Sequence, residues 1–273
     1  MKLWLKNPLS ILAENAGGGI VVEGTSIVEL VPSGEQPSLP YDSVFDASSH
    51  IILPGLINLH HHFYQTLTRV FPAALNKDLF PWLKTLYPIW AKLSPEALRL
   101  GTRLALAELL LSGCTTTSDH HYIFPSGLEK AIDWQVEEAQ LLGIRVVLCR
   151  GSMDRSQKDG GLPPDSVVQT SDEILEDSER LINKYHNSNE GAMTQIALAP
   201  CSPFSVSEKV MHESSKLSKK HSVLLHTHLA ETEDENSFCL EKMGCRPLEY
   251  LEQVGWLTNR TWLCLLYTSP SPR

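Results

Sequence analysis

From residue 56 onward the sequence alternates short apolar runs with longer stretches in which apolar residues recur at helical spacing, and this alternation limits the fold most. Strands that are separated by helices require right-handed crossovers and therefore form a parallel sheet. A (β/α) barrel and an open doubly wound sheet both satisfy this pattern. No glycine-rich phosphate loop follows the first strand, which counts against a nucleotide-binding doubly wound fold. The predicted strands are residues 56–59, 115–118, 144–148, 195–199 and 223–226.

The helices between these strands have recognisable ends. Ser94 is a suitable N-cap, Pro95 fits the first turn, and Gly113 ends that helix. Residues 1–53 differ, because they contain only short strands separated by turns, and they predict a β unit that is too small to be stable alone. Further helices are predicted at residues 128–142, 171–185 and 207–221.

Charge and cysteine content narrow the range of partners. The 273 residues carry a formal net charge of −9 and no run of lysine or arginine, whereas binding to a nucleic-acid backbone requires a clustered cationic face. No apolar run reaches membrane-spanning length, and residues 1–8 lack the features of a signal peptide. The six cysteines form no CxxC pair and are expected as reduced thiols. We therefore expect a cytoplasmic protein with a small-molecule substrate and no nucleic-acid or membrane partner, and a homo-oligomer is left open.

Two histidines end the first predicted strand. Side chains alternate between the faces of a strand, so His60 and His62 point the same way and His61 points the opposite way. Two imidazoles at the carboxyl end of a strand provide half of a metal site, and active sites of barrels are built at that end. A surface histidine cluster has the same spacing, so this pair alone is weak evidence.

The strand at residues 223–226 repeats the pattern with His226 and His228, and Glu231 follows three residues later. Neutral imidazole suits zinc or ferrous iron, and a catalytic site needs a base that is not a ligand to take a proton from water. Glu231 is placed for that role. His226 lies one layer deeper than His228 and is interpreted as a core histidine with a polar partner. Two such pairs are hard to explain by packing alone.

These residues resemble the amidohydrolase superfamily, in its cytosine/guanine deaminase and triazine hydrolase branch. The segment Leu53-Pro54-Gly55-Leu56-Ile57-Asn58 before His60-x-His62 is typical of the first barrel strand in that family, and His228-x-x-Glu231 is typical of the fifth. The resemblance covers about residues 1–263. It implies a distorted (β/α)8 barrel, of which residues 54–263 form an incomplete part, and a small β-sandwich to which residues 1–53 contribute. It also implies metal ligands at His60, His62 and His228 and a proton shuttle at Glu231.

Three further positions have substrate roles implied by the resemblance. Gln65 matches a glutamine that contacts the purine edge in guanine-type deaminases, with a solvated loop amide as the alternative. Cys201 stands where many relatives carry a substrate-binding histidine, with a packing cysteine as the alternative. Of the two histidines that end the second strand, His120 and His121, the latter is expected to line the pocket. Cys201, together with residues 71–72, 80–83 and 117–122, is similar to the bacterial 8-oxoguanine deaminases.

The resemblance implies one divalent metal ion, zinc or alternatively iron. Residues 194–207 contain no lysine, whereas binuclear relatives bridge two metals with a carboxylated lysine on the fourth strand. The implied reaction is the hydrolytic deamination of an oxidised purine, 8-oxoguanine to urate and ammonia, and guanine or a triazine is the alternative substrate. The competing hypothesis is a non-catalytic relative that keeps the barrel as a binding module and purifies without stoichiometric metal.

The last residues depart from the family pattern. The sixth strand is expected to begin at residues 260–263, and the resemblance then places a ligand histidine at about Leu265 and an aspartate after the eighth strand. No histidine follows His228, and Asp234 is the only later aspartate. Pro270 and Pro272 cannot continue a central strand. We expect residues 264–273 to be a non-native tail and this chain to be inactive and poorly soluble alone, compared with a version completed from the same genome.

Overall fold

The computed structural model describes residues 1–269, and the chain divides into two compact units. Unit 1 comprises Met1–Leu56 with Asn189–Gly191, and unit 2 comprises the rest. Pro270 and Pro272, at which the strand was expected to break, lie outside the described residues. No helix in the described part of the chain has both the length and the apolar character that a membrane crossing needs.

Unit 1 contains the small β unit that the sequence predicts. Its main sheet has the strand order β4-β3-β1-β5, and Trp4, Val21 and Val31 form its buried core. Residues 43–52 form two strands rather than one, because the Asp46 carboxylate accepts the Ser48 amide and turns the chain. The strands are β1 (Lys2–Lys6), β2 (Ser10–Ile11), β3 (Gly19–Glu23), β4 (Ser26–Val31), β5 (Ser43–Asp46) and β6 (Ile51–Ile52).

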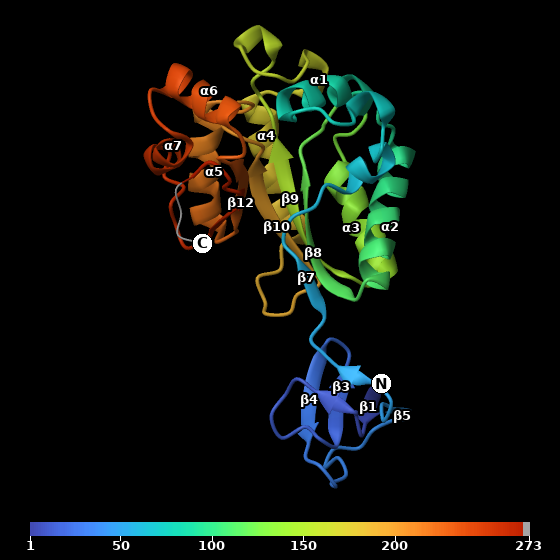
Figure 1. Cartoon of the computed structure of the whole chain (residues 1–273). Helices are drawn as coiled ribbons and strands as arrows, with labels where there is room; N and C mark the ends of the chain where they lie inside the picture. The colour runs from blue at the N-terminus through green and yellow to red at the C-terminus, as the bar shows by residue number, and fades with distance from the viewer. Residues whose placement is uncertain (270–273) are drawn as a thin grey trace. The chain divides into compact units, whose positions relative to one another are not determined.

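Unit 2 is built on a six-stranded sheet in which spatial order follows chain order, from β7 to β12 (Figure 1). Each neighbouring pair from β8 to β12 is parallel. A doubly wound sheet reverses its strand order at a switch point, so the uninterrupted order confirms the barrel type of sheet. The strands are β7 (Leu56–Asn58), β8 (Cys114–His121), β9 (Arg145–Ser152), β10 (Thr194–Pro200), β11 (Leu225–Leu229) and β12 (Thr261–Leu265).

The helices of unit 2 begin and end close to the predicted signals. The Ser94 hydroxyl accepts the Ala97 amide at the start of α2, and Gly143 ends α3 in the left-handed conformation with φ of 72°. The helices are α1 (Leu79–Trp90), α2 (Pro95–Leu111), α3 (Ala131–Leu142), α4 (Ser171–Tyr185), α5 (Glu208–His221), α6 (Glu233–Met243) and α7 (Pro247–Gln253). Short 3-10 turns occur at η1 (Phe63–Thr68), η2 (Pro72–Ala74), η3 (Gln157–Asp159) and η4 (Asp165–Val167).

Two elements differ from the sequence-based expectation. Helix α1 was not expected, because Pro81 and the interior Pro88 are residues that normally oppose helix formation. Strand β12 extends to Leu265 and pairs in parallel with β11, with Cys264 opposite His228, so the ladder runs two residues beyond the expected break. That the residues from 264 onward are non-native stays a prediction.

Candidate metal centre and active site

Three histidines from two distant parts of the chain meet at one point in unit 2. His60 and His62 lie just after β7, and His228 is in β11. One ring nitrogen from each lies within 4.8 Å of the others, and the Nε2 atoms of His62 and His228 are 3.2 Å apart. Parallel strands end at the same edge of a sheet, which explains why residues separated by 166 positions converge. The structure thus brings the three predicted ligands together.

Hydrogen bonds fix which nitrogen of these rings faces the centre. The Nδ1 atoms of His62 and His228 each lie 2.7 Å from a main-chain carbonyl oxygen, those of His120 and Cys201. A carbonyl oxygen only accepts, so both Nδ1 atoms must carry the hydrogen. In the neutral rings both Nε2 atoms are therefore lone-pair acceptors, and two acceptors cannot hydrogen-bond to each other.

A divalent cation bound by both Nε2 atoms would account for their close approach. Zinc–nitrogen bonds of about 2.0–2.1 Å in tetrahedral geometry separate two ligand nitrogens by roughly 3.3 Å, close to the 3.2 Å observed here. Burial lowers the pKa of His62 and of His228 well below the usual value, and neighbouring histidines add to the effect, so both rings are neutral. Burial also lowers the pKa of His60 to about 4. Three neutral imidazoles at this spacing fit a divalent metal.

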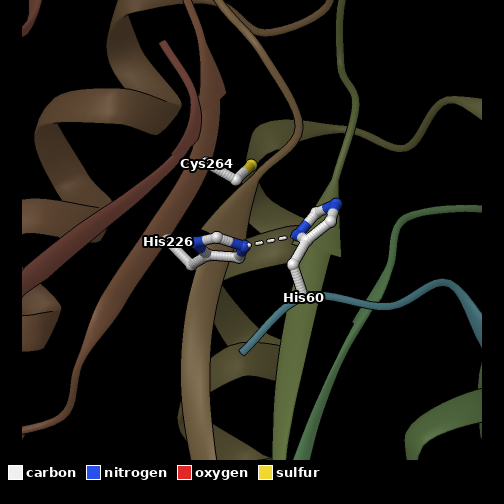
Figure 2. Close-up of side chains that lie close together, drawn as sticks. All are labelled: His60, His226 and Cys264. Atoms are coloured by element: carbon white, nitrogen blue, oxygen red, sulfur yellow. Dashed lines mark hydrogen bonds between the residues drawn. The ribbon is translucent and has the colours of Figure 1, made fainter. Parts of the chain in front are cut away.

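A second group of potential ligands, His60, His226 and Cys264, shares His60 with the first, and Figure 2 shows its three side chains. The thiol of Cys264 donates to the Thr227 carbonyl at 3.3 Å, and burial raises its pKa well above the usual value. The thiolate is the form that binds metals, so a metal bound here would have to displace the thiol hydrogen and break its bond to the Thr227 carbonyl.

The three histidines open into a cavity of about 250 Å³. Glu231, Gln65 and Cys201 line the same cavity, so three of the four remaining predicted site residues gather there. Leu265, where the family resemblance implies a further histidine ligand, lines it as well. The other walls are largely aromatic and apolar, which suits a flat heterocycle. They are formed by Leu79, Trp82, Leu83, Tyr87, Tyr122, Ser202 and Phe204.

Glu231 has the properties of a general base. Burial raises the pKa of its carboxyl to about 7, and the nearby Glu235 carboxyl adds to the shift. A base whose pKa lies near the working pH transfers protons efficiently. The residue before it, Ala230, adopts a left-handed conformation with φ of 51°. The Glu235 carboxylate accepts the main-chain amides of Ala230 and Glu231 at 3.0 and 2.8 Å, which fixes this turn.

Glu235 is a residue whose role sequence reasoning missed. The sequence analysis did not single out Glu235, yet its side chain is fully buried. Thr232-x-x-Glu235 has the spacing of a capping box, in which a glutamate reaches back to main-chain amides at a helix start. That spacing was the available signal.

The structure does not bring His121 to the cavity. Its ring is buried and packs against Tyr64 and Phe124, with ring centroids 5.3 and 4.9 Å away. His120 points to the other face of β8 and stacks on the ring of His228 at 4.5 Å. The pocket role predicted for His121 is therefore corrected, because alternation along the strand turns it away from the metal centre.

Metal-free protein should lose stability as the pH falls below 6.5. Burial lowers the pKa of His121 from 6.5 to about 3. The unfolded chain then binds a proton that the folded chain excludes, so this contribution is complete above pH 6.5 and is lost as the pH falls toward 3. Such a histidine contributes about 1.4 kcal/mol to the change between pH 7.5 and 5.5.

Urea unfolding of the His121→Phe variant at these two pH values should show a pH dependence smaller by about that amount. The same substitution at the exposed His50 is the control. An unchanged pH dependence in His121→Phe would show that His121 titrates normally in the folded state.

Comparison with known proteins finds relatives that match most of this chain. A sequence model described as the Amidohydrolase family matches residues 51–267. The chain is 58% identical over 265 residues to 8-oxoguanine deaminase of Pseudomonas aeruginosa, which covers 96% of this chain and 59% of the relative. It is 34% identical to hydroxydechloroatrazine ethylaminohydrolase of a Pseudomonas species, over 77% of this chain and 44% of that protein.

Solved structures agree with the sequence comparisons. Atrazine chlorohydrolase from Arthrobacter aurescens, complexed with zinc, superposes with a TM-score of 0.86 at 28% identity, covering 96% of this chain and 60% of that one. The chain thus spans about 60% of the length of the 8-oxoguanine deaminase and of the atrazine chlorohydrolase, and 44% of the ethylaminohydrolase. Proteins of the matched family typically depend on divalent metals. With a family match over most of its residues, a barrel-type sheet and a histidine cluster at the strand ends, this chain belongs to the amidohydrolase family.

Proposed function

We propose that this chain is part of a hydrolytic deaminase that converts 8-oxoguanine and water into urate and ammonia. The observation that carries the proposal is a single cavity in which three neutral imidazoles converge beside a carboxyl group with a pKa near 7. The 58% identity to an 8-oxoguanine deaminase supports this choice of substrate. Guanine or a triazine is the alternative, since relatives that act on other heterocycles share the fold.

The proposed mechanism assigns the proton transfers to Glu231. A divalent metal held by His60, His62 and His228 would supply the positive charge that makes a water molecule acidic near neutral pH. Glu231 takes a proton from the attacking water and passes it to N3 of the purine as the C–O bond forms at C2. It then moves the second water proton from the new hydroxyl group to the amino group, so that the C–N bond breaks, ammonia departs and the ring carbon becomes a carbonyl.

The polar groups of the cavity suit a purine edge. The side-chain amide of Gln65 donates to the hydroxyl groups of Tyr122 and Tyr64 at 3.2 and 3.4 Å. Its N–H groups are thereby used, which leaves the carbonyl oxygen to accept an N–H of the substrate. Burial raises the pKa of the Cys201 thiol to about 12, so Cys201 presents a small neutral surface. Trp82 and Phe204 supply aromatic faces for the rings.

We further propose a single zinc ion, with iron as the alternative, and a cytoplasmic location. Three nitrogen ligands suit zinc, and a structural relative was crystallised with that metal. The six cysteines are free thiols, which suits a reducing compartment. The net charge of −9 supports a small heterocycle rather than a nucleic acid as the partner.

The test is an activity panel on the completed version, meaning residues 1–263 continued as their own genome encodes them. Conversion of 8-oxoguanine to urate is followed by absorbance and ammonia release, beside guanine and triazines. Higher kcat/KM on another heterocycle would replace the proposed substrate. Protein that purifies without metal and turns over nothing would instead indicate a binding module.

In the same protein, Gln65→Ala should raise KM for 8-oxoguanine about 3- to 10-fold with little change in kcat. The reason is that one neutral hydrogen bond contributes roughly 0.5–1.5 kcal/mol to binding. Steady-state kinetics measure the effect, and the exposed Gln157, substituted in the same way, is the control. Unchanged kinetics on every purine tested would remove the assigned role.

A further inference from the structure

The third proposed ligand, His60, has a different hydrogen-bond partner at Nδ1 from the other two. The Nδ1 atoms of His62 and His228 reach main-chain carbonyls directly. The Nδ1 atom of His60 instead lies 2.9 Å from Nε2 of His226, as Figure 2 shows. The other nitrogen of His226, Nδ1, lies 2.9 Å from the carbonyl oxygen of Trp262 in β12. A second imidazole therefore stands between this ligand and the carbonyl that orients it.

The positions of the hydrogens along this series of hydrogen bonds follow from its last acceptor, the Trp262 carbonyl oxygen. The Trp262 carbonyl only accepts, so His226 carries its hydrogen on Nδ1. Nε2 of the neutral His226 ring is then an acceptor, and the hydrogen in the next bond must belong to Nδ1 of His60. Consequently the lone pair of His60 is on Nε2, the same atom that the carbonyl bonds leave free in His62 and His228.

His226 is itself held rigidly. It is fully buried and stacks on the indole ring of Trp262, with ring centroids 4.3 Å apart and planes 13° apart. A buried ring held by stacking on one side and a hydrogen bond on the other has little freedom to rotate or to exchange its donor and acceptor atoms.

We infer that His226 is a positioning residue that sets the tautomer and the orientation of His60, so that Nε2 of His60 faces the metal. This inference rests on the proposed metal site. It replaces the general assignment of His226 as a core histidine with a specific one, because the partner of His226 is a ligand. Outer partners of metal-binding histidines typically change metal affinity by about 10–100-fold.

Two substitutions in the completed version separate hydrogen bonding from packing. In His226→Gln the amide oxygen can stand near the position of Nε2 and accept from His60. In His226→Leu the side chain fills the space but offers no acceptor. We expect His226→Leu to weaken zinc binding by about 10–100-fold and His226→Gln to restore most of that loss. Competition with a chelator measures the zinc Kd.

The control is His186→Leu. His186 also has a main-chain partner, since its Nδ1 accepts the Ile196 amide at 3.2 Å, but it lies at the C-terminal end of α4 and belongs to neither group of potential ligands. It should leave the zinc Kd unchanged. Equal losses in His226→Leu and His226→Gln would overturn the inference, as would a zinc Kd in His226→Leu that matches the wild type.

A measurement on the wild-type protein keeps the inference testable if the leucine variant fails to fold. Nitrogen chemical shifts of the histidine rings in metal-free protein should show His60 with its hydrogen on Nδ1, and a hydrogen on Nε2 would overturn the inference. Neither Kd nor tautomer depends on turnover. A protein that binds zinc through this arrangement but leaves 8-oxoguanine unchanged would contradict the proposed function alone.

Discussion

Glu231→Gln in the completed version is expected to lower kcat for deamination by about 100-fold or more while zinc content stays close to one ion per chain. Glutamine has nearly the same shape but cannot take a proton from the attacking water. Glu231 belongs to neither group of potential metal ligands, so the metal should remain bound. Initial rates and metal analysis of the same preparation measure the two effects.

The control for this variant is Asp234→Asn, which removes an exposed carboxyl from the same helix start. It should leave both the rate and the metal unchanged. A comparable loss of zinc in Glu231→Gln would instead identify Glu231 as a ligand. The acid side of the pH–rate profile offers a second check, because the base form of Glu231 is lost as the pH falls through its pKa.

His228→Ala should have the largest effect on metal binding and is expected to weaken zinc affinity by more than about 100-fold, beyond the range for outer partners. The substitution removes Nε2 of His228, which lies 3.2 Å from Nε2 of His62. The two imidazoles that remain are too few ligands for a zinc site. Zinc should therefore stabilise the wild type in a thermal melt, by about 2.7 kcal/mol at a hundredfold excess over Kd, and should not stabilise the variant.

His50→Ala is the control for general effects of losing a histidine, since His50 is exposed and lies in unit 1. Zinc should stabilise this control as it does the wild type. A normal zinc-dependent shift in His228→Ala would show that the metal binds elsewhere, and the proposed mechanism would fail with it.

Local sequence signals determined much of this fold. The alternation of strands and helices and the Ser94 cap predicted most elements of unit 2, because caps and apolar periodicity act within a few residues. The histidine pairs at the ends of two predicted strands indicated a metal site at one edge of the sheet, because parallel strands end at the same edge. The family resemblance then implied which of these histidines, His60, His62 and His228, are the ligands.

Tertiary contacts decided the remainder of the site. Helix α1 supplies much of the cavity wall although its prolines oppose a helix, because buried side chains such as Leu86 and Trp90 hold it in place. Strand alternation told His120 and His121 apart only once the orientation of β8 in the sheet was known. The bond between His60 and His226 joins residues 166 positions apart. The sequence determined which side chains could bind a metal, but the tautomer of each ring depends on carbonyls brought alongside by folding.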